Sequence, residues 1–402
     1  MNDRWRTAVR LSGFGAGYFF AAGAFMSYWP VWLRHRGISD AEIGTLYMTR
    51  QLVSVGATLA IGFLAHRIGN LRGMLLALTV AAFVMMGAYQ LSYTFLALLL
   101  VGLIWGAVWA PTMALYDGVL VNEARARGLV YGKLRVWGSV AFILGTVLCG
   151  VAVQHFGPPW VLYVALAGIL VLAPFAFVLP TAESHPIGTA RHPRFGVLDL
   201  LRSRPFLLFM IAAGFCQSSH AVLYSFGTLT WRSAGIDDVT ISLLWGESVA
   251  VEILMMMASG WLLQRVGVTG MIGFGLACGL VRWTGLALTT NLLALVFLQA
   301  LHAGTFAACH LGAMAFIQRA LPANGVALGQ SLYYALGTGA TQAVIYQFAG
   351  LLHARFGQHA FLGMTAISAI GLASLLLLAR TWKGEVLVTS KSEERATPVA
   401  QS

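Results

Sequence analysis

Long apolar runs, separated by short polar breaks, repeat along the entire chain. Most runs reach or exceed the ~20 residues that an α-helix needs to cross the hydrocarbon of a bilayer. They are continuously apolar rather than alternating, which favours helices over the strands of a membrane β-barrel. We therefore predict an all-α membrane protein with twelve transmembrane helices, over residues 8–33, 41–66, 72–91, 94–121, 132–155, 159–180, 205–231, 239–264, 269–288, 291–318, 326–353 and 358–380.

One polar break is much longer than the others. The segment 181–204, "TAESHPIGTARHPRFGVLDLLRSR", combines charged residues with proline and glycine, which is typical of a linker. It predicts two six-helix bundles, at 1–180 and 205–382, joined by a cytoplasmic linker. The polar end at 383–402 is expected to be a cytoplasmic tail without fixed structure.

The two predicted bundles repeat one another in sequence. Matching residues lie 198 positions apart and are Gly37 with Gly235, Gly62 with Gly260, Arg67 with Arg265, and Gly69 with Gly267. A second match, "GVAVQHFG" at 150–157 with "GLLHARFG" at 350–357, has an offset of 200. A duplicated helical unit is typical of secondary transporters, whose halves rock about a substrate site near the membrane midplane.

The composition excludes a water-soluble fold. Hydrophobic residues make up 58% of the chain and charged residues only 10%, where soluble domains carry about 25% charged residues. The 4 cysteines lie singly in separate predicted helices, so they indicate neither a disulfide framework nor a zinc site. No nucleotide loop or catalytic motif occurs, and we expect no metal, no cofactor and no enzymatic activity.

The net charge of +11 reflects membrane topology rather than a nucleic-acid partner. With a cytoplasmic N-terminus, 18 basic residues fall on the cytoplasmic side and 4 on the opposite side, as the positive-inside rule expects. The 4 are Arg34, Arg36, Arg232 and Arg355. Both termini are therefore expected in the cytoplasm.

A few ionisable residues lie inside the predicted spans, where hydrocarbon makes them costly and function is the default explanation. They include Arg50, Asp117, Arg135, Glu247, Glu252, Arg282, His220 and His302. Asp117 and Arg135 lie at adjoining ends of the fourth and fifth helices, so we expect them to meet as a functional pair. The alternatives are a structural ion pair, an arginine that snorkels to the headgroups, and an acid at a solvated helix end.

Four segments resemble the 3-phenylpropionic acid permease family, a branch of the major facilitator superfamily related to lactose permease. They are "YGKLRVWGSVAFILG" (131–145), "QSSHAVLYSF" (217–226), "CGLVRW" (278–283) and "LHAGTFAACHLGAM" (301–314). The glycine and arginine pattern at 62–69 and 260–267 is also similar to the superfamily's loop motif. In it His66 and Gln264 stand where the motif has an acid. The resemblance implies the twelve-helix MFS fold, with gating loops at Gly62, Arg67, Gly69, Gly260, Arg265 and Gly267.

The resemblance also implies a substrate site. In lactose permease an acid and an arginine at the spacing of Asp117 and Arg135 hold the substrate. The planar guanidinium of Arg135 suits a carboxylate, which it can bind with two parallel hydrogen bonds. Trp137, Tyr224 and Trp283 share helix segments with charges and are expected to flank an aromatic ring, the alternative for tryptophans being packing or the interfacial belt. His220 is interpreted either as a hydrogen-bond donor or proton relay, or as a core histidine.

Proton coupling is expected on the second half. Arg282 and His302 correspond to the arginine and histidine of lactose permease, but Thr305 stands where that protein has its carboxylate. Glu252 matches an acid of the phenylpropionate branch and is our first candidate for the proton, with Glu247 the second. The two are about 140° apart on a helix and cannot both face one point.

Arg50 has no counterpart in the family pattern. We expect it either to compensate Glu247 or to adjust specificity.

Taken together, these observations predict a monomeric, proton-coupled symporter of the bacterial inner membrane that imports a small aromatic carboxylate. Its expected partners are that substrate, protons and the lipid bilayer, with no nucleic acid. The alternatives are a symporter of a neutral sugar or nucleoside, a carrier of a siderophore-like aromatic chelate, and an exporter.

Overall fold

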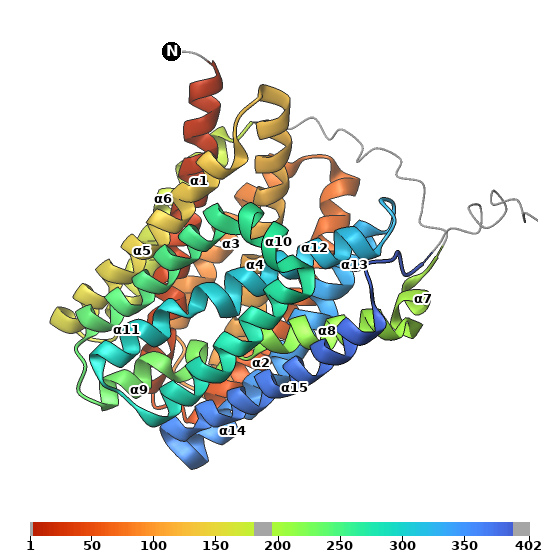
Figure 1. Ribbon diagram of the computed structural model, residues 1–402. Helices are drawn as coiled ribbons and strands as arrows, with labels where there is room; N and C mark the ends of the chain where they lie inside the picture. The colour runs from red at the N-terminus through yellow and green to blue at the C-terminus, as the bar shows by residue number, and fades with distance from the viewer. Residues whose placement is uncertain (1–2, 181–194, 389–402) are drawn as a thin grey trace, which may run out of the picture.

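The computed structural model describes residues 3–180 and 195–388, and within these ranges the chain is almost entirely helical, with no strand. The helices lie alongside one another as a bundle (Figure 1). The first half consists of α1 (Asp3–His35), α2 (Asp40–Ile68), α3 (Leu71–Gln90), α4 (Phe95–Arg127), α5 (Tyr131–Phe156) and α6 (Trp160–Val178).

The second half begins with the short α7 (Val197–Arg202), and several of its spans are interrupted by π-helical turns. Its elements are α8 (Arg204–Ser218), η1 (Leu223–Gly227), α9 (Thr228–Ser233), α10 (Asp238–Leu288), α11 (Leu292–Ala300), η2 (Ala303–Ala308), α12 (Cys309–Ala320), α13 (Val326–Leu332), η3 (Tyr333–Ala340), α14 (Thr341–Phe356), η4 (Gly357–Ala360) and α15 (Phe361–Thr381).

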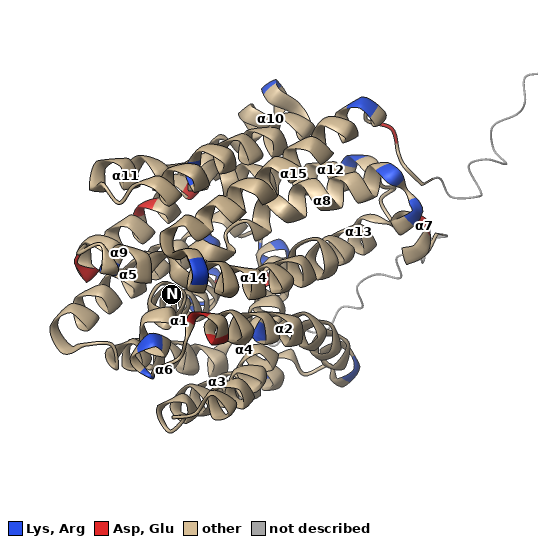
Figure 2. Ribbon diagram, turned by 90° about the horizontal axis from the view of Figure 1, so that it is seen from below, with Lys and Arg blue, Asp and Glu red and all other residues tan. Residues whose placement is uncertain are grey.

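The predicted number of spans is confirmed. In the described chain, 9 helical stretches are long and apolar enough to cross a membrane. Two of them, 238–288 and 326–381, are 51 and 56 residues long and change direction at Gly267 and Gly357, so each supplies two crossings. With the less apolar α1, the bundle has twelve spans. Most of the ribbon in Figure 2 is tan, and the charged residues appear as isolated coloured segments.

Helix bounds agree with the apolar runs to within a few residues, except at polar ends. The helix α4 continues to Arg127, beyond the predicted end at 121, because Arg127 bonds Glu123 one turn back at 2.8 Å and also pairs with Asp3. The predicted linker lies partly outside the described residues, at 181–194. Of the expected tail, residues 383–388 turn back onto the bundle, where the Leu387 amide donates to the Ala320 carbonyl at 2.8 Å.

Three of the glycine pairs that the two halves share form matching turns. These glycines have positive φ, which a residue with a side chain rarely adopts, whereas other shared glycines, such as Gly62 and Gly260, lie within helices. The φ values are 80° and 85° at Gly37 and Gly235, 70° at both Gly69 and Gly267, and 87° and 53° at Gly157 and Gly357. An ion pair recurs with the same offset, between Arg34 and Asp40 in the first half and between Arg232 and Asp238 in the second.

The two halves share one apolar core at one end of the bundle and have separate cores at the other. We call the end that carries the turns at 36–39 and 234–237 the closed face, and the end that carries the turns at 69–70 and 128–130 the terminal face. A single cluster near the closed face contains residues of both halves, among them Tyr28 and Trp245. Toward the terminal face, Phe14 belongs to a cluster of the first half and Phe209 to one of the second.

Backbones of the two halves touch at the closed face through two matching contacts. A Cβ added at Gly350 on α14 would lie 2.6 Å from the Asp40 carbonyl oxygen, and one added at Gly150 on α5 would lie 2.7 Å from the Asp238 carbonyl oxygen. A contact between polar side chains also joins the two halves in this region. The Nδ1 atom of His353 lies 2.9 Å from Asp40 Oδ2. The structure is therefore a conformation shut at the closed face.

Gly44 on α2 offers a test of this closure. A Cβ at Gly44 would lie 2.8 Å from the Tyr346 carbonyl oxygen, so Gly44→Val should push α2 away from α14 and favour opening of the closed face. The test uses a second substitution, Ser27→Cys, at a buried position. The protein is placed in lipid nanodiscs and treated with a hydrophilic maleimide, and we expect Gly44→Val to raise the rate at which this cysteine is labelled.

Gly56→Val on the same helix is the matched control, because nothing lies within 4 Å of a Cβ there. The native cysteines are buried and set the background. Equal labelling in the two variants would show that this contact does not hold the face shut.

Candidate functional site

A cavity of about 590 Å³ lies between the two halves, within the size range of small-molecule sites. Its first-half wall comes from α1, α2 and α4, and its second-half wall from η1 and the α13–α14 span. Aromatic rings dominate the lining and come from Tyr18, Phe25, Tyr47, Trp105, Trp109, Tyr224, Tyr334 and Tyr346. The exposed lining residues Leu59 (57%) and Tyr334 (49%) lie toward the terminal face, so the cavity opens there.

Most rings of the first-half wall stack on one another. The rings of Tyr18 and Trp109 are 4.1 Å apart, those of Trp109 and Trp105 are 4.8 Å apart, and Phe25 follows at 5.3 Å from Trp105. Among the described lining residues Arg50 is the one charged group, and no acid lines the cavity. The wall thus offers flat apolar surfaces and a single positive charge.

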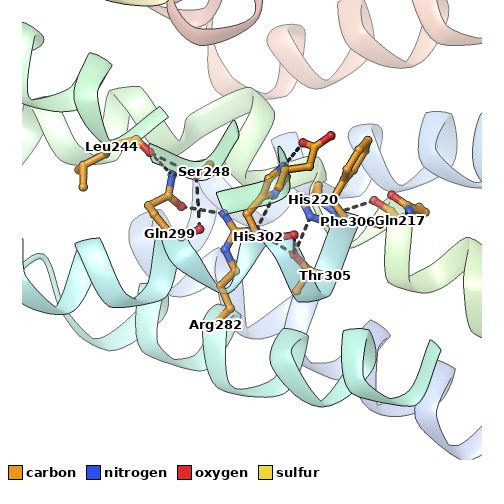
Figure 3. A network of polar contacts seen from close by, with 10 residues as sticks. Gln217, His220, Leu244, Ser248, Arg282, Gln299, His302, Thr305 and Phe306 are labelled. Carbon is orange, nitrogen blue, oxygen red and sulfur yellow. Dashed lines mark hydrogen bonds and ion pairs between the residues drawn. The ribbon is translucent and has the colours of Figure 1, made fainter. Parts of the chain in front are cut away.

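A second polar group, the network of Figure 3, lies inside the second half around the fully buried Arg282. Its guanidinium donates to Gln299 Oε1 at 2.8 Å, to Thr305 Oγ1 at 2.9 Å and to His302 Nδ1 at 3.0 Å. Gln299 in turn donates to Ser248 Oγ at 3.0 Å. In the described part of the chain Arg282 makes no ion pair, so neutral acceptors stabilise its charge.

The network fixes the protonation of His302. Because Arg282 donates to Nδ1, that nitrogen must be an acceptor, and the ring proton of neutral His302 sits on Nε2. This Nε2 lies 3.6 Å from Glu252 Oε2. The Glu252 side chain keeps 18% of its surface exposed, so it sits between a buried imidazole and accessible space. The three proton-coupling candidates Glu252, His302 and Arg282 thus lie in one chain of contacts.

A π-helical turn shapes this region. In η2 the wider turn starts directly after His302 and contains Thr305, and such turns are frequent at functional sites. The Thr305 hydroxyl lies 3.0 Å from His220 Nε2, while His220 Nδ1 donates to the Gln217 carbonyl at 2.9 Å. The residue that replaces the expected carboxylate is therefore a hydroxyl bridge between Arg282 and His220.

The structure does not pair Asp117 with Arg135. Asp117 accepts a hydrogen bond from Tyr131 Oη at 2.9 Å, and the Arg135 guanidinium stacks 4.0 Å from the ring centre of Phe19. The hydrogen-bond partner of Asp117 is thus Tyr131, which lies one turn before Arg135 on α5.

The remaining predicted site residues differ in whether they line the cavity. Tyr224 lines the cavity and stacks on His220 with ring centres 5.4 Å apart. Trp137 is 55% exposed and lies two positions from Arg135 on a helix, so it points in a different direction and does not line the cavity. Glu247 is subject to the charge of Arg282 rather than that of Arg50. The suggested compensation between Arg50 and Glu247 does not form.

The expected gating loops occupy equivalent turns. Arg67 is in the last turn of α2 before Gly69, and Arg265 stacks 4.5 Å over the Trp261 ring just before Gly267. A Cβ at Gly62 or Gly260 would meet nothing within 4 Å.

Sequence reasoning missed the neutral part of the site. Gln299 and Ser248 hold the Arg282 network, and Tyr18 and Phe25 face the cavity, yet none carries a charge that would distinguish it within an apolar helix. A buried glutamine in a span was the one signal available for Gln299. Within the described ranges no cluster of His, Cys, Asp or Glu has the composition of a metal site.

The chain is similar in sequence to a family of known proteins. The profile of the MFS_1 like family matches residues 8–362. A relative from Escherichia coli (strain K12), described as "Probable 3-phenylpropionic acid transporter", is 30% identical over 87% of this chain and 92% of its own length. The maltose permease of Geobacillus stearothermophilus is 25% identical over 94% of this chain and 96% of its own.

Solved structures share the fold. The nucleoside transporter NupG superposes with a TM-score of 0.82 at 15% identity, covering 94% of this chain and 100% of NupG. A bacterial homologue of the human lysosomal transporter Spinster, in an inward-facing and unoccupied conformation, superposes with a TM-score of 0.73 at 14% identity. The match covers 95% of this chain and 98% of the homologue.

Thr305→Val tests the hydroxyl bridge. The substitution keeps the shape but removes an acceptor for Arg282 and a partner for His220, both fully buried, so we expect a loss of about 1–3 kcal/mol in the free energy of unfolding. SDS-titrated unfolding in mixed micelles measures it. Thr381→Val is the control, because that exposed hydroxyl bonds only its own helix. Equal stability of both variants would remove Thr305 from the network.

Proposed function

Because this chain belongs to the MFS_1 like family, we propose that it is a proton-coupled symporter that imports a small aromatic carboxylate by alternating access. The family and the relatives are transporters, so the chain is an integral membrane transporter and not an enzyme. The observation that carries the proposal is the cavity, whose wall is rich in aromatic rings and, among the described residues, holds one positive charge and no acid. Similarity to the protein described as a 3-phenylpropionic acid transporter supports the same substrate class.

Glu252 is the proposed proton carrier. Its carboxylate adjoins the His302 Nε2 proton and is subject to the charge of Arg135 across the interface of the halves. Protonation of Glu252 would remove the attraction between Glu252 and Arg135, and rocking of the halves changes the distance between them. Moving one proton with a monoanion also avoids work against the membrane potential, which is about 2.3 kcal/mol per charge at 100 mV.

The substrate is proposed to lie against Tyr224 and the stacked rings of α1 and α4, with Asp117, Arg135 and His220 at the border of the cavity. Glu247, near Arg282, is the second candidate for the proton. The position of Trp137 outside the cavity gives no support to its predicted role in substrate binding. We further propose a monomer in the bacterial inner membrane with both termini cytoplasmic, in which the turns at Arg67 and Arg265 gate the terminal face.

A neutral sugar is the second candidate substrate. The maltose permease similarity favours it, and Gln51, Ser54 and Gln342 supply hydrogen-bonding groups in the cavity wall. None of the described lining residues is a carboxylate that could bind sugar hydroxyls, which favours the anion.

Proton-coupled uptake is tested in liposomes that enclose a pH-sensitive dye. Adding 3-phenylpropionate outside should acidify the interior with saturable kinetics, beyond the leak of the undissociated acid in protein-free liposomes. Lactose is added to a parallel sample. A response to lactose alone would move the assignment to a neutral sugar, and no saturable response to either would refute both substrate classes.

Glu252→Gln separates proton coupling from substrate binding. The amide keeps the size of the side chain but cannot change charge, so we expect exchange of labelled 3-phenylpropionate across the membrane to persist while accumulation driven by a pH gradient stops. Glu42→Gln is the matched control, since it lies in the capping box at the start of α2 and glutamine also serves there. Accumulation retained in Glu252→Gln and lost in Glu247→Gln would pass the proton to Glu247.

A further inference from the structure

We infer that Arg50 binds the substrate carboxylate in the aromatic cavity, and so selects acids over their neutral analogues. The inference rests on the proposed function for the class of ligand and goes beyond it in assigning the anion to a group that the sequence alone left without a role. Arg50 lies on α2 and is the only charged residue among the described residues that line the cavity.

The surroundings of Arg50 supply aromatic faces but no anion. Its guanidinium carbon lies 4.8 Å from the ring centre of Tyr47 and 5.4 Å from that of Phe25. Within the described chain no carboxylate pairs with it, and its side chain donates no hydrogen bond. A half-buried guanidinium has five N–H donors to satisfy and is costly to leave without acceptors. The fork of Arg50 is therefore available to a ligand that accepts two hydrogen bonds.

The other two arginines inside the bundle are already engaged. Arg282 is fully buried and bonds Gln299, His302 and Thr305, which leaves no face toward the cavity. Arg135 stacks on Phe19 and is not among the residues that line the cavity. Of the three, Arg50 alone combines a place in the cavity wall with the absence of a protein anion.

One phenolic hydroxyl in the same cavity wall has a proton to donate. The hydroxyls of Tyr18 and Tyr47 already donate to the backbone carbonyls of Trp109 and Tyr224, whereas Tyr346, which also lines the cavity, donates no hydrogen bond within the described chain. The Tyr346 oxygen accepts a bond from Gln342 Nε2 at 3.0 Å, so its own proton remains available to donate. A guanidinium with a phenolic donor beside it provides the charge-assisted hydrogen bonds that carboxylates prefer.

The ring wall lies beside this charge. The Phe25 ring lies between Arg50 and the Trp105 ring, and the row of rings continues to Trp109 and Tyr18. An acid with a short spacer between carboxylate and phenyl ring can place one end on Arg50 and the other against these rings. Such stacked and offset ring pairs are favourable beyond the area that they bury.

The test compares 3-phenylpropionate with its neutral amide, 3-phenylpropanamide, by calorimetric titration of the full-length protein in detergent. The wild-type protein should prefer the acid. Arg50→Gln should weaken binding of the acid by roughly 10- to 100-fold and leave the affinity for the amide nearly unchanged, because only the charged ligand loses its ionic hydrogen bonds. Arg50→Lys should give an intermediate loss, since an ammonium keeps the charge but not the planar fork.

Two further variants make the result specific. Arg355→Gln is the matched control, because Arg355 also stacks on an aromatic ring, 5.6 Å from that of Phe356, but lies exposed at the end of α14, and it should bind as the wild type does. Arg135→Gln is the rival. Loss of acid preference in Arg135→Gln with normal preference in Arg50→Gln would overturn the inference and return the carboxylate to Arg135.

The remaining outcomes separate the inference from the proposed function. If the acid binds through Arg50 but liposome uptake carries no proton, the inference stands and proton coupling is refuted. If proton-coupled uptake of the acid is intact in Arg50→Gln, the function stands and the inference is refuted. If the wild-type protein binds the amide as well as the acid, or binds neither, Arg50 is not the group that selects an anion.

Discussion

Hydrocarbon stabilises no charge, so every ionised group inside the bundle needs a partner from the protein, from water or from the transported molecule. Three arginines meet this constraint in different ways. Arg282 is enclosed by neutral acceptors, and Arg135 stacks on the ring of Phe19. Arg50 opens onto a cavity that no acid among the described residues lines. Much of the organisation of the site follows from which partner each guanidinium has.

The partner of Arg282 gives the second half its polar centre. With Thr305 in place of a carboxylate, the acid of this centre comes from α10, where Glu252 meets His302. The Glu252 side chain is 18% exposed, so this acid adjoins accessible space, which a carboxylate at the fully buried position 305 would not. In the function that we propose, this is where the proton is gained and lost.

The closed face is held together by close backbone contacts between the two halves. The halves meet there through matched contacts in which glycine lets a helix lie against a carbonyl of the opposite half, at Gly350 with Asp40 and at Gly150 with Asp238. Contacts of this kind are either made or lost and do not deform gradually. Separate cores toward the terminal face leave room for the cavity, and the rocking that we propose would close this end and open the other.

The sequence by itself determined the spans, the duplication and the fold. Hydropathy fixes the spans because the bilayer demands about the same apolar length each time, and the repeated glycines mark turns whose positive φ is a local property of the chain. Resemblance to a related family singled out Glu252, Arg282 and His302 as candidates for proton coupling.

Only the tertiary structure decided which charges meet and which side chains face the cavity. Asp117 bonds Tyr131 instead of Arg135, Trp137 points away, and Arg50 lies among aromatic rings. Each of these outcomes depends on the rotation of one helix against another. In an apolar span that rotation leaves little periodic signal, because lipid-facing and core-facing positions are equally hydrophobic.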